Sequence, residues 1–209
     1  MSDSPRSLLA QPAEVVAPLL LGGILRCRGA DGTVSLRLTE VEAYSGEGED
    51  PGSHAHRGPS KRNAVMFGPP GHLYTYFTYG MHVCANVVCL PEGRAAGILF
   101  RAGEILEGEE LARSRRTTSR ARKDLAQGPA RLCVALGIEL GDYGLDLFDP
   151  ASRVTLQLPE APLGAEQVGV GPRTGIAQPG GAETPWRFWV LGDPTVSPYK
   201  AAAPRPPRG

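Results

Sequence analysis

Apolar side chains recur at two different spacings along this chain, and the spacing predicts where helices and strands lie. Residues 13–21 carry apolar side chains at helical spacing and precede a Gly-Gly pair, which indicates a short helix ending at a turn. A second helix is predicted over residues 104–116, because acidic residues come early and arginines late, the order that the helix dipole favours. A third is predicted over residues 129–136, where a proline stands at the first position.

Alternating apolar and polar residues, rich in β-branched and aromatic types, predict strands elsewhere. The predicted strands cover residues 24–28, 33–44, 72–90 with a break near Gly80, 95–102, 154–158, 167–170 and 186–191. A Gly-Ala-Asp-Gly turn signal at residues 29–32 joins the first two, so they should pair as an antiparallel hairpin. Residues 45–63 match neither pattern, and an ordered loop of this length in a compact domain is typical of a functional segment.

Length and composition favour one compact domain with many turns. The chain has 209 residues, of which 41% are apolar, enough to form a buried core. Its 27 glycines and 20 prolines indicate frequent turns and short strands. With no internal repeat and no second boundary visible, we expect one domain over residues 13–199. Residues 1–12 are expected to be flexible, and residues 200–209 to form a disordered tail rich in Pro and Arg.

The charges exclude a broadly basic surface. Lys and Arg total 22, as do Asp and Glu, so binding to nucleic acid would need a local basic patch. The longest apolar stretch, residues 15–25, is too short to span a bilayer, and no secretory signal is visible. We therefore expect a cytoplasmic protein with reduced thiols. The cysteines and histidines lack metal-ligand spacing, so neither a metal nor a cofactor is expected.

The strand predicted over residues 33–44 carries the first candidate chemistry. Period-two alternation places on one face Val34, Leu36, Leu38, Glu40, Glu42 and Tyr44. A carboxylate at the end of a core-facing strand, one step from a tyrosine, could act as a general base beside a stacking surface. A glutamate on the protein surface is the alternative interpretation.

Aromatic and basic residues form two further clusters. Tyr74 and Tyr76 share a face of their predicted strand, with Tyr79 near its break, and tyrosine offers a face on which a base can stack. An ordinary aromatic core is the alternative. The long loop holds a local basic cluster of His54, His56, Arg57, Lys61 and Arg62. This cluster is either functional or part of a solvated loop.

Several motifs together resemble a known enzyme family. They are Thr39-Glu-Val-Glu-Ala-Tyr44, Asp50-Pro-Gly-Ser-His54, Arg62-Asn63, Met66-Phe67, Gly71-His-Leu-Tyr-Thr-Tyr-Phe-Thr-Tyr-Gly-Met-His82, Asn86, Leu99-Phe-Arg-Ala102 and Val168-Gly-Val-Gly171. In their order and spacing, the chain is similar to the alkyladenine (3-methylpurine) DNA glycosylases over nearly its whole length.

The resemblance implies a mixed α/β fold: a single domain with a curved antiparallel sheet as its core, peripheral helices and long loops. It implies a monofunctional glycosylase that flips damaged purines out of double-stranded DNA and hydrolyses the N-glycosidic bond, which initiates base excision repair. The implied lesions are alkylated or deaminated purines of the class of 3-methyladenine, 7-methylguanine, hypoxanthine and ethenoadenine. We expect a monomer that uses no membrane, associated with the nucleoid if the source is a prokaryote.

The resemblance also implies roles for individual residues. Glu42 matches the general base that deprotonates a water attacking C1′ of the sugar, and Arg101 matches the residue that helps to hold this water. Tyr44, His54 and Tyr76 match the walls between which the flipped base stacks.

Other matched positions surround this implied site. Tyr74 stands behind the stacking walls, and Asn86 matches a residue whose bulk disfavours the exocyclic amino group of normal guanine. Tyr79 matches a wedge inserted through the minor groove, with Met81 close by. Three arginines align with phosphate contacts: Arg62, Arg113 and Arg116.

Two other functions compete with this interpretation. Residues 168–177 resemble the hairpin of helix-hairpin-helix glycosylases, but strand-like residues follow where a helix is needed. A non-catalytic module that binds damaged DNA is the other alternative, and the match of Glu42 and Arg101 to catalytic positions argues against it.

Overall fold

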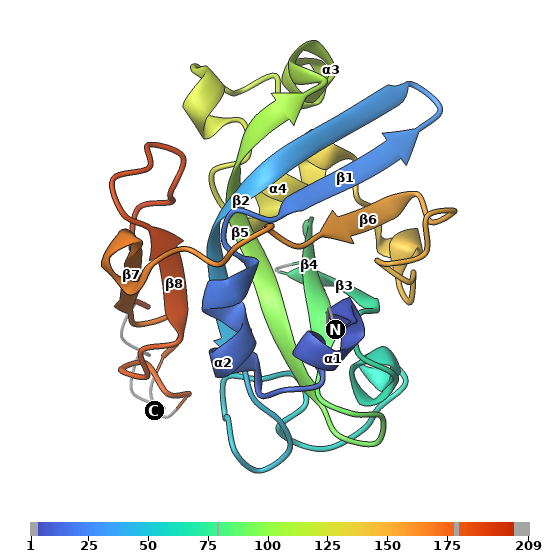
Figure 1. Ribbon diagram of the computed structural model, residues 1–209, viewed down its shortest axis with the longest axis vertical. Coiled ribbons are helices and arrows are strands. Elements are labelled where there is room, and N and C mark those ends of the chain that lie inside the picture. The colour runs from blue at the N-terminus through green and yellow to red at the C-terminus, as the bar shows by residue number, and fades with distance from the viewer. Residues whose placement is uncertain (1–3, 79, 178–179, 203–209) are drawn as a thin grey trace, which may run out of the picture.

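Eight strands form one antiparallel sheet in the computed structural model, which describes residues 4–78, 80–177 and 180–202 (Figure 1). The strands are β1 (Ile24–Gly29), β2 (Gly32–Tyr44), β3 (Leu73–Thr78), β4 (His82–Cys89), β5 (Ala96–Glu107), β6 (Val154–Gln157), β7 (Val168–Gly171) and β8 (Arg187–Val190). Their order is β3-β4-β5-β2-β1-β6, and β8 pairs with both β2 and β7. The predicted strands and the hairpin between β1 and β2 are confirmed, and the sheet belongs to a mixed α/β fold.

Short helices flank the sheet. They are α1 (Pro5–Leu9), α2 (Ala13–Val16), α3 (Glu109–Arg115) and α4 (Pro129–Leu136), with 3-10 turns at η1 (Ala17–Leu20), η2 (Ala64–Phe67), η3 (Arg122–Asp124), η4 (Leu140–Asp142) and η5 (Ala165–Gln167). The helix predicted over residues 13–21 is present as α2 followed by η1, and α4 has the predicted bounds. Helix α1 lies in the segment that we expected to be flexible, and its Leu9 is completely buried in the main core.

The helix predicted over residues 104–116 is wrong in its first part. Residues 104–107 continue β5 and pair with β2, and α3 begins only at Glu109. The glycine between them, Gly108, adopts a left-handed backbone with a φ of 75°, which a helix interior does not contain. An added Cβ there would lie 2.2 Å from the carbonyl oxygen of Thr33. The pattern of early acids and late arginines that we assigned to one helix holds within α3 alone.

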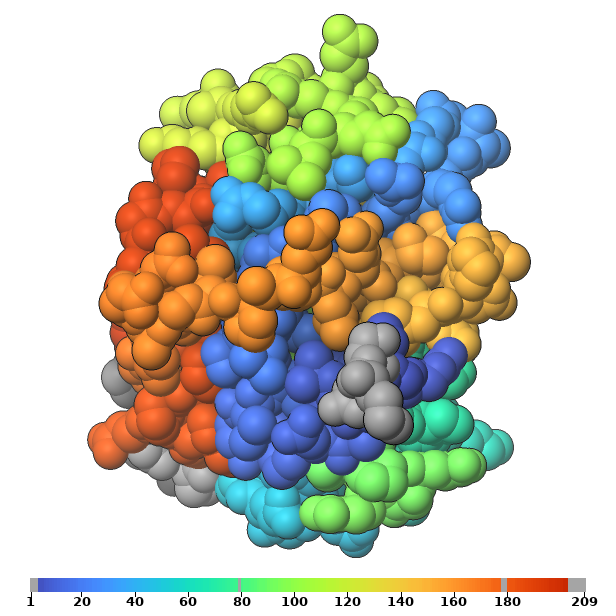
Figure 2. All heavy atoms as spheres, in the orientation of Figure 1, coloured from blue at the N-terminus to red at the C-terminus, as the bar shows by residue number. Residues whose placement is uncertain are grey.

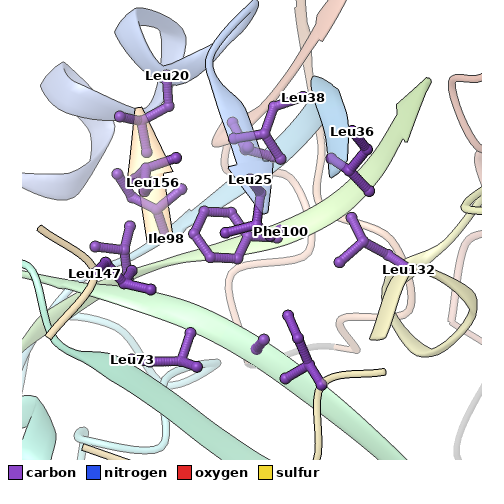
Figure 3. Packing of buried hydrophobic residues seen from close by; sticks show 14 of the residues in the cluster. Leu20, Leu25, Leu36, Leu38, Leu73, Ile98, Phe100, Leu132, Leu147 and Leu156 are labelled. Atoms are coloured by element: carbon purple, nitrogen blue, oxygen red, sulfur yellow. The ribbon is translucent and has the colours of Figure 1, made fainter. Parts of the chain in front are cut away.

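The main hydrophobic core lies between the sheet and the helices. Phe100 on β5 is completely buried at its centre, among Leu25, Leu36 and Leu38 from the first hairpin and Leu132 from α4 (Figure 3). In the orientation of Figure 1, the N-terminal segment (blue) and the segment between β6 and β7 (orange) cross the front of the molecule (Figure 2). The buried charged side chains of β2 and β5 are not part of this core and lie on the second face of the sheet.

An irregularity in β2 decides which side chains reach that second face. Register shifts relative to β5 occur between Leu38 and Glu40 and between Glu40 and Val41. Before this bulge the even-numbered residues of β2 enter the main core, and after it Val41 and Ala43 do so. A bulge inserts an extra residue and reverses the alternation. The predicted single face from Val34 to Tyr44 is therefore wrong, because its acidic end lies on the side opposite to its apolar beginning.

Candidate active site

The Glu42 side chain of β2 is completely buried, and its carboxylate has three donors. The backbone N–H of Thr174 donates to Oε1 over 2.6 Å, and the hydroxyl of Tyr44 donates to Oε2 over 2.8 Å. Nη1 of Arg101 lies 3.3 Å from Oε2. Burial and the nearby charge of Glu42 raise the pKa of Tyr44 well above its ordinary value, so this hydroxyl keeps its proton. Two hydrogen bonds and one ion pair thus fix the Glu42 carboxylate, and none of its surface is exposed.

Arg101 of β5 connects Glu42 to a second buried carboxylate, Glu40. Its Nε donates to Oε1 of Glu40 over 2.7 Å, and Nε of Arg187 on β8 donates to the same oxygen over 2.7 Å. Burial by itself lowers the pKa of Arg101, but the charges of Glu42 and Glu40 outweigh it and raise that pKa. Burial likewise favours neutral Glu40, yet Arg101 and Arg187 hold its pKa below the ordinary value. Arg101 and Glu40 are therefore both charged, and each fixes the other.

Three aromatic rings stand beside this network. The rings of Tyr74 and Tyr76 on β3 stack with centroids 5.4 Å apart, and the ring of His54 meets that of Tyr76 edge-on at 4.4 Å. Burial raises the pKa of Tyr74 to about 12, so its hydroxyl keeps its proton, and it shares a hydrogen bond of 2.9 Å with Nδ1 of His54. Burial, helped by the charge of Arg62, lowers the pKa of His54. The imidazole is therefore neutral at neutral pH.

The loop that carries His54 is anchored by buried polar contacts rather than by regular structure. Asp50 and Arg173 are both buried and form two short contacts, of 2.6 and 2.8 Å. The guanidinium of Arg173 also lies 4.5 Å from the ring centroid of Tyr44. Asn63 closes the loop by donating from Nδ2 to the backbone oxygen of His54 over 2.9 Å. These contacts tie the loop to β2 and to the segment after β7.

Two cavities adjoin at this site. The first, which we call the aromatic pocket, encloses about 130 Å³ and is lined by Tyr44, Gly52, Ser53, His54, Met66, Tyr74, Tyr76, Thr78, Asn86 and Ile176. The second, the outer cavity, encloses about 360 Å³. It shares Tyr44 and Tyr76 with the aromatic pocket and is also lined by Arg101 and Thr174, so it meets all three donors to Glu42. A larger hollow of about 530 Å³ lies between β1, β6 and residues 147–150, away from these side chains.

Known proteins resemble this chain over nearly its whole length. The model of the methylpurine-DNA glycosylase family matches residues 7–194. A relative from Streptomyces avermitilis is 54% identical over 96% of this chain and 93% of its own length. A relative from Leifsonia xyli is 55% identical over 93% of this chain and 91% of its own. Both relatives are named as candidate 3-methyladenine DNA glycosylases.

The chain belongs to the methylpurine-DNA glycosylase family. It is accordingly a DNA-binding hydrolase that acts on N-glycosyl bonds. The alternative of a non-catalytic binding module does not agree with membership of a family of glycosylases. The helix-hairpin-helix alternative is wrong as well, because residues 168–171 form β7, which pairs with β8.

The structure brings together most of the residues that the glycosylase resemblance singled out. Glu42, Arg101 and Tyr44 are in contact, and His54, Tyr74 and Tyr76 line the adjoining pocket with Tyr44. Asn86 on β4 lies opposite Tyr74 in the strand register, and its Nδ2 donates to the Tyr74 carbonyl over 3.3 Å.

Among the described residues assigned to the wedge or to the phosphate contacts, Arg62 touches this cluster: its guanidinium lies 5.9 Å from the ring centroid of Tyr76. Met81 is 72% exposed in the connection between β3 and β4, and Tyr79 lies outside the described residues. Exposed Arg62 donates to the Phe77 carbonyl over 3.0 Å. Arg113 pairs with Glu109 of its own helix, and neither Arg113 nor Arg116 lines the two cavities.

Arg116 lies at a different point of the fold from the aromatic pocket. Its Nε donates to the carbonyl of Leu125 over 3.1 Å. Partial burial, helped by the charge of nearby Arg131, lowers the pKa of Arg116. Because Arg131 lines the outer cavity, Arg116 stands behind the rim of that cavity rather than within it.

Sequence reasoning missed four residues that hold the site. They are Glu40, Arg173, Thr174 and Arg187. The strand alternation that drew attention to Glu42 also included Glu40, so that signal was present. The three others follow Glu42 by more than a hundred residues, and no local pattern shows that the segments after β6 return to β2.

Two further properties of the described residues are relevant. Within 4–78, 80–177 and 180–202, none of the helices has the length and apolar character to cross a membrane. In the same part of the chain, His, Cys, Asp and Glu side chains form no group of three or more that could bind a metal ion. The four cysteines are all buried and free, as expected of small apolar side chains.

Proposed function

We propose that this glycosylase removes alkylated or deaminated purines from double-stranded DNA with a water activated by Glu42. The observation that carries the proposal is the surrounding of Glu42: a buried carboxylate held by two hydrogen bonds and one ion pair, whose three partners all line the outer cavity. A general base must hold its proton acceptor within hydrogen-bond reach of the reactant. Thr174, Tyr44 and Arg101 fix both carboxylate oxygens directly behind the wall of the outer cavity, which these three residues line.

The two cavities suit the two halves of a damaged nucleotide. The aromatic pocket has the stacking faces and the few polar groups that a flipped purine requires. The outer cavity has the Arg101 guanidinium and an open side, which suit the sugar and the backbone. In this arrangement the N-glycosidic bond lies near Glu42, where water attacks C1′, Glu42 takes a proton from that water, and the purine leaves with the bonding electrons.

The proposed lesions follow from the energetics of flipping. Extruding a base costs a few kcal/mol, and stacking returns about 1–3 kcal/mol per base. Two tyrosines and a histidine can therefore offset the cost, most easily for damaged bases that pair weakly. A cationic purine such as 3-methyladenine or 7-methylguanine is already a good leaving group. Neutral hypoxanthine and ethenoadenine depend more strongly on the positioning of water and base.

The test is release of the damaged base from a duplex oligonucleotide that contains one lesion. In single turnover, the wild type should release the base and leave an intact strand with an abasic site. Because water is the nucleophile, borohydride should trap no protein–DNA adduct. Failure to release a base from any of the four lesion types would contradict the proposal, as would cleavage of the strand without added alkali.

A further inference from the structure

An aromatic and basic groove lies on the edge of the sheet, behind the aromatic pocket. It encloses about 340 Å³, and we call it the edge groove. Its lining residues are Lys61, Arg62, Thr75, Phe77, Leu140 and Tyr143, together with Tyr76. Because β3 is the last strand of the sheet on this side, the groove is not covered by another strand.

Large apolar side chains are unusually exposed in this groove. Phe77 is 48% exposed, Leu140 is 40% exposed and Tyr143 is 36% exposed. Single exposed apolar residues need no explanation, but several gathered in one hollow mark a surface that binds something. The Tyr143 ring and the Leu140 backbone are also held in place: the Tyr143 hydroxyl accepts from the backbone N–H of Val65 over 2.8 Å, and Thr75 Oγ1 donates to the Leu140 carbonyl over 3.0 Å.

The charges around the edge groove favour an anionic partner. Lys61 and Arg62 are both exposed at one side of it. Asp142, which follows Leu140 closely in the chain, is engaged by Arg153 with contacts of 2.5 and 2.6 Å. Glu139, which precedes Leu140 in the chain, is a second acidic residue here and is exposed. A fixed aromatic surface flanked by cations is the arrangement that binds a stacked base and its phosphate.

The edge groove is continuous with the candidate active site. Tyr76 lines both the groove and the aromatic pocket, and the Tyr143 ring meets that of Tyr74 edge-on at 6.1 Å. Period-two alternation along β3 directs Tyr74 and Tyr76 to the pocket and Thr75 and Phe77 to the other side. DNA that places a base in the pocket therefore passes close to this groove.

We propose that the edge groove holds an unstacked nucleotide of the substrate DNA near the lesion. Its base would lie against Phe77 and Tyr143, and Lys61 and Arg62 would contact its phosphate. Flipping one base deprives its neighbours of a stacking partner, and the groove would replace that partner and stabilise the distorted duplex. The inference rests on the proposed function, since it assumes that the aromatic pocket takes a base from DNA.

The first test compares two variants with matched controls. Phe77→Ser removes the stacking ring, and Leu106→Ser removes a side chain of similar exposure (47%) that lies outside the groove. Lys61→Ala removes the phosphate contact, and Lys123→Ala removes an exposed lysine of η3. Equilibrium binding is measured by fluorescence anisotropy on a lesion duplex with a 2′-fluoro sugar, which slows cleavage of the glycosidic bond.

Phe77→Ser should weaken binding by about tenfold, the loss expected for one stacked base. Lys61→Ala should lower the slope of log affinity against log salt by about 0.9, the value for one phosphate contact. The two controls should bind as the wild type does. Equal affinity and salt slope for groove variants and controls would overturn the inference.

The second test locates the nucleotide. 2-Aminopurine is placed in turn at each position near the lesion on both strands, and its fluorescence reports stacking. At one position, the 2-aminopurine fluorescence should change on binding of the wild type and of Leu106→Ser but not on binding of Phe77→Ser. The oligomeric state of the same variants is measured without DNA by sedimentation. If the wild type were a dimer, and Phe77→Ser abolished the dimer without changing DNA affinity, the groove would bind a second copy of the chain. That result would overturn the proposal. A wild type that releases no base contradicts the proposed function, whereas an active wild type with unaffected groove variants contradicts only this inference.

Discussion

At the scale of single residues, the site depends on how the Glu42 carboxylate is surrounded. Thr174 and Tyr44 place neutral donors on its two oxygens, and Arg101 adds a charged one. Charge-assisted hydrogen bonds are short and directional, and the bond of 2.7 Å from Arg101 to Glu40 holds the guanidinium beside Glu42. The position of Glu42 therefore depends on a second buried carboxylate, Glu40.

Replacing Glu42 with glutamine should abolish excision while the protein still binds lesion DNA. The amide has nearly the same size but cannot take the proton from water, and general base catalysis contributes about 10²–10⁴ in rate. Single-turnover rates and equilibrium binding would be measured on the same duplex. Glu47→Gln, at an exposed position in the following loop, is the matched control and should retain the full rate. A Glu42→Gln rate within threefold of the wild type would refute the assigned role.

His54 should make excision sensitive to acid. Burial lowers its pKa, and its neutral ring shares a hydrogen bond with the hydroxyl of Tyr74. The neutral form predominates above this lowered pKa, so the rate should fall as the pH decreases through it, at a value below the 6.5 of an unperturbed histidine. The fall should be steeper for cationic 7-methylguanine than for neutral hypoxanthine, because a protonated ring repels a cationic base.

The pH dependence of the rate for each lesion provides the measurement. His54→Gln should move the acid limb to lower pH and remove the difference between the two lesions. His72→Gln, at a histidine outside the aromatic pocket, should leave the profile unchanged. An acid limb that is identical in the wild type and in His54→Gln would show that another group controls it.

At the scale of elements, β2 shows how much of the fold and of the site could be predicted from the sequence. The alternation of residues predicted the strand, its hairpin and the importance of its acidic end. The bulge near Glu40 could not be predicted, since it arises from the register between β2 and β5, two strands far apart in the chain. Glu42 was therefore placed on the correct strand but on the wrong face.

The boundary between β5 and α3 gives a second example, with its own prediction. Charge order alone predicted a helix through Gly108, whereas pairing with β2 extends the strand up to that glycine. Gly108→Ala should destabilise the protein by more than about 1 kcal/mol, because alanine resists a positive φ and its Cβ would collide with the Thr33 carbonyl. Gly141→Ala, where an added Cβ meets no atom within 4 Å, is the control. Urea unfolding measures the free energy of unfolding of each variant, and equal values for Gly108→Ala and Gly141→Ala would contradict the argument.

The buried pair of Asp50 and Arg173 should be the critical link between the long loop and the C-terminal segment. Asp50→Asn leaves the Arg173 guanidinium buried without a counter-charge, which typically costs about 3–5 kcal/mol. Glu109→Gln breaks an exposed pair within α3 and should cost less than about 1 kcal/mol. Thermal or urea unfolding separates the two variants. Asp50→Asn should also slow excision, because the loop positions His54, and a fully stable and active variant would exclude the proposed link.

At the scale of the whole molecule, a chain without net charge must bind DNA through the placement of a few groups. The aromatic pocket, the outer cavity and the edge groove share residues of β3, and the exposed Met81 lies just beyond the end of that strand. On the proposed function, we therefore expect burial of bases rather than neutralisation of many phosphates to be the main source of affinity. Such an enzyme should be sensitive to how firmly the lesion is stacked and paired.

The connection after β3 provides the last prediction, through Tyr79, the residue that the family resemblance assigns to the wedge. A wedge supports flipping rather than bond cleavage, so Tyr79→Ala should reduce excision strongly from a well-paired lesion and only slightly from one opposite a mismatch or a gap, where the base is already partly unstacked. Glu42→Gln should instead reduce excision in every context. Single-turnover rates on matched duplexes give the comparison. If Tyr79→Ala lowered the rate by the same factor on paired and unpaired lesions, Tyr79 would belong to the pocket or the core rather than to the wedge.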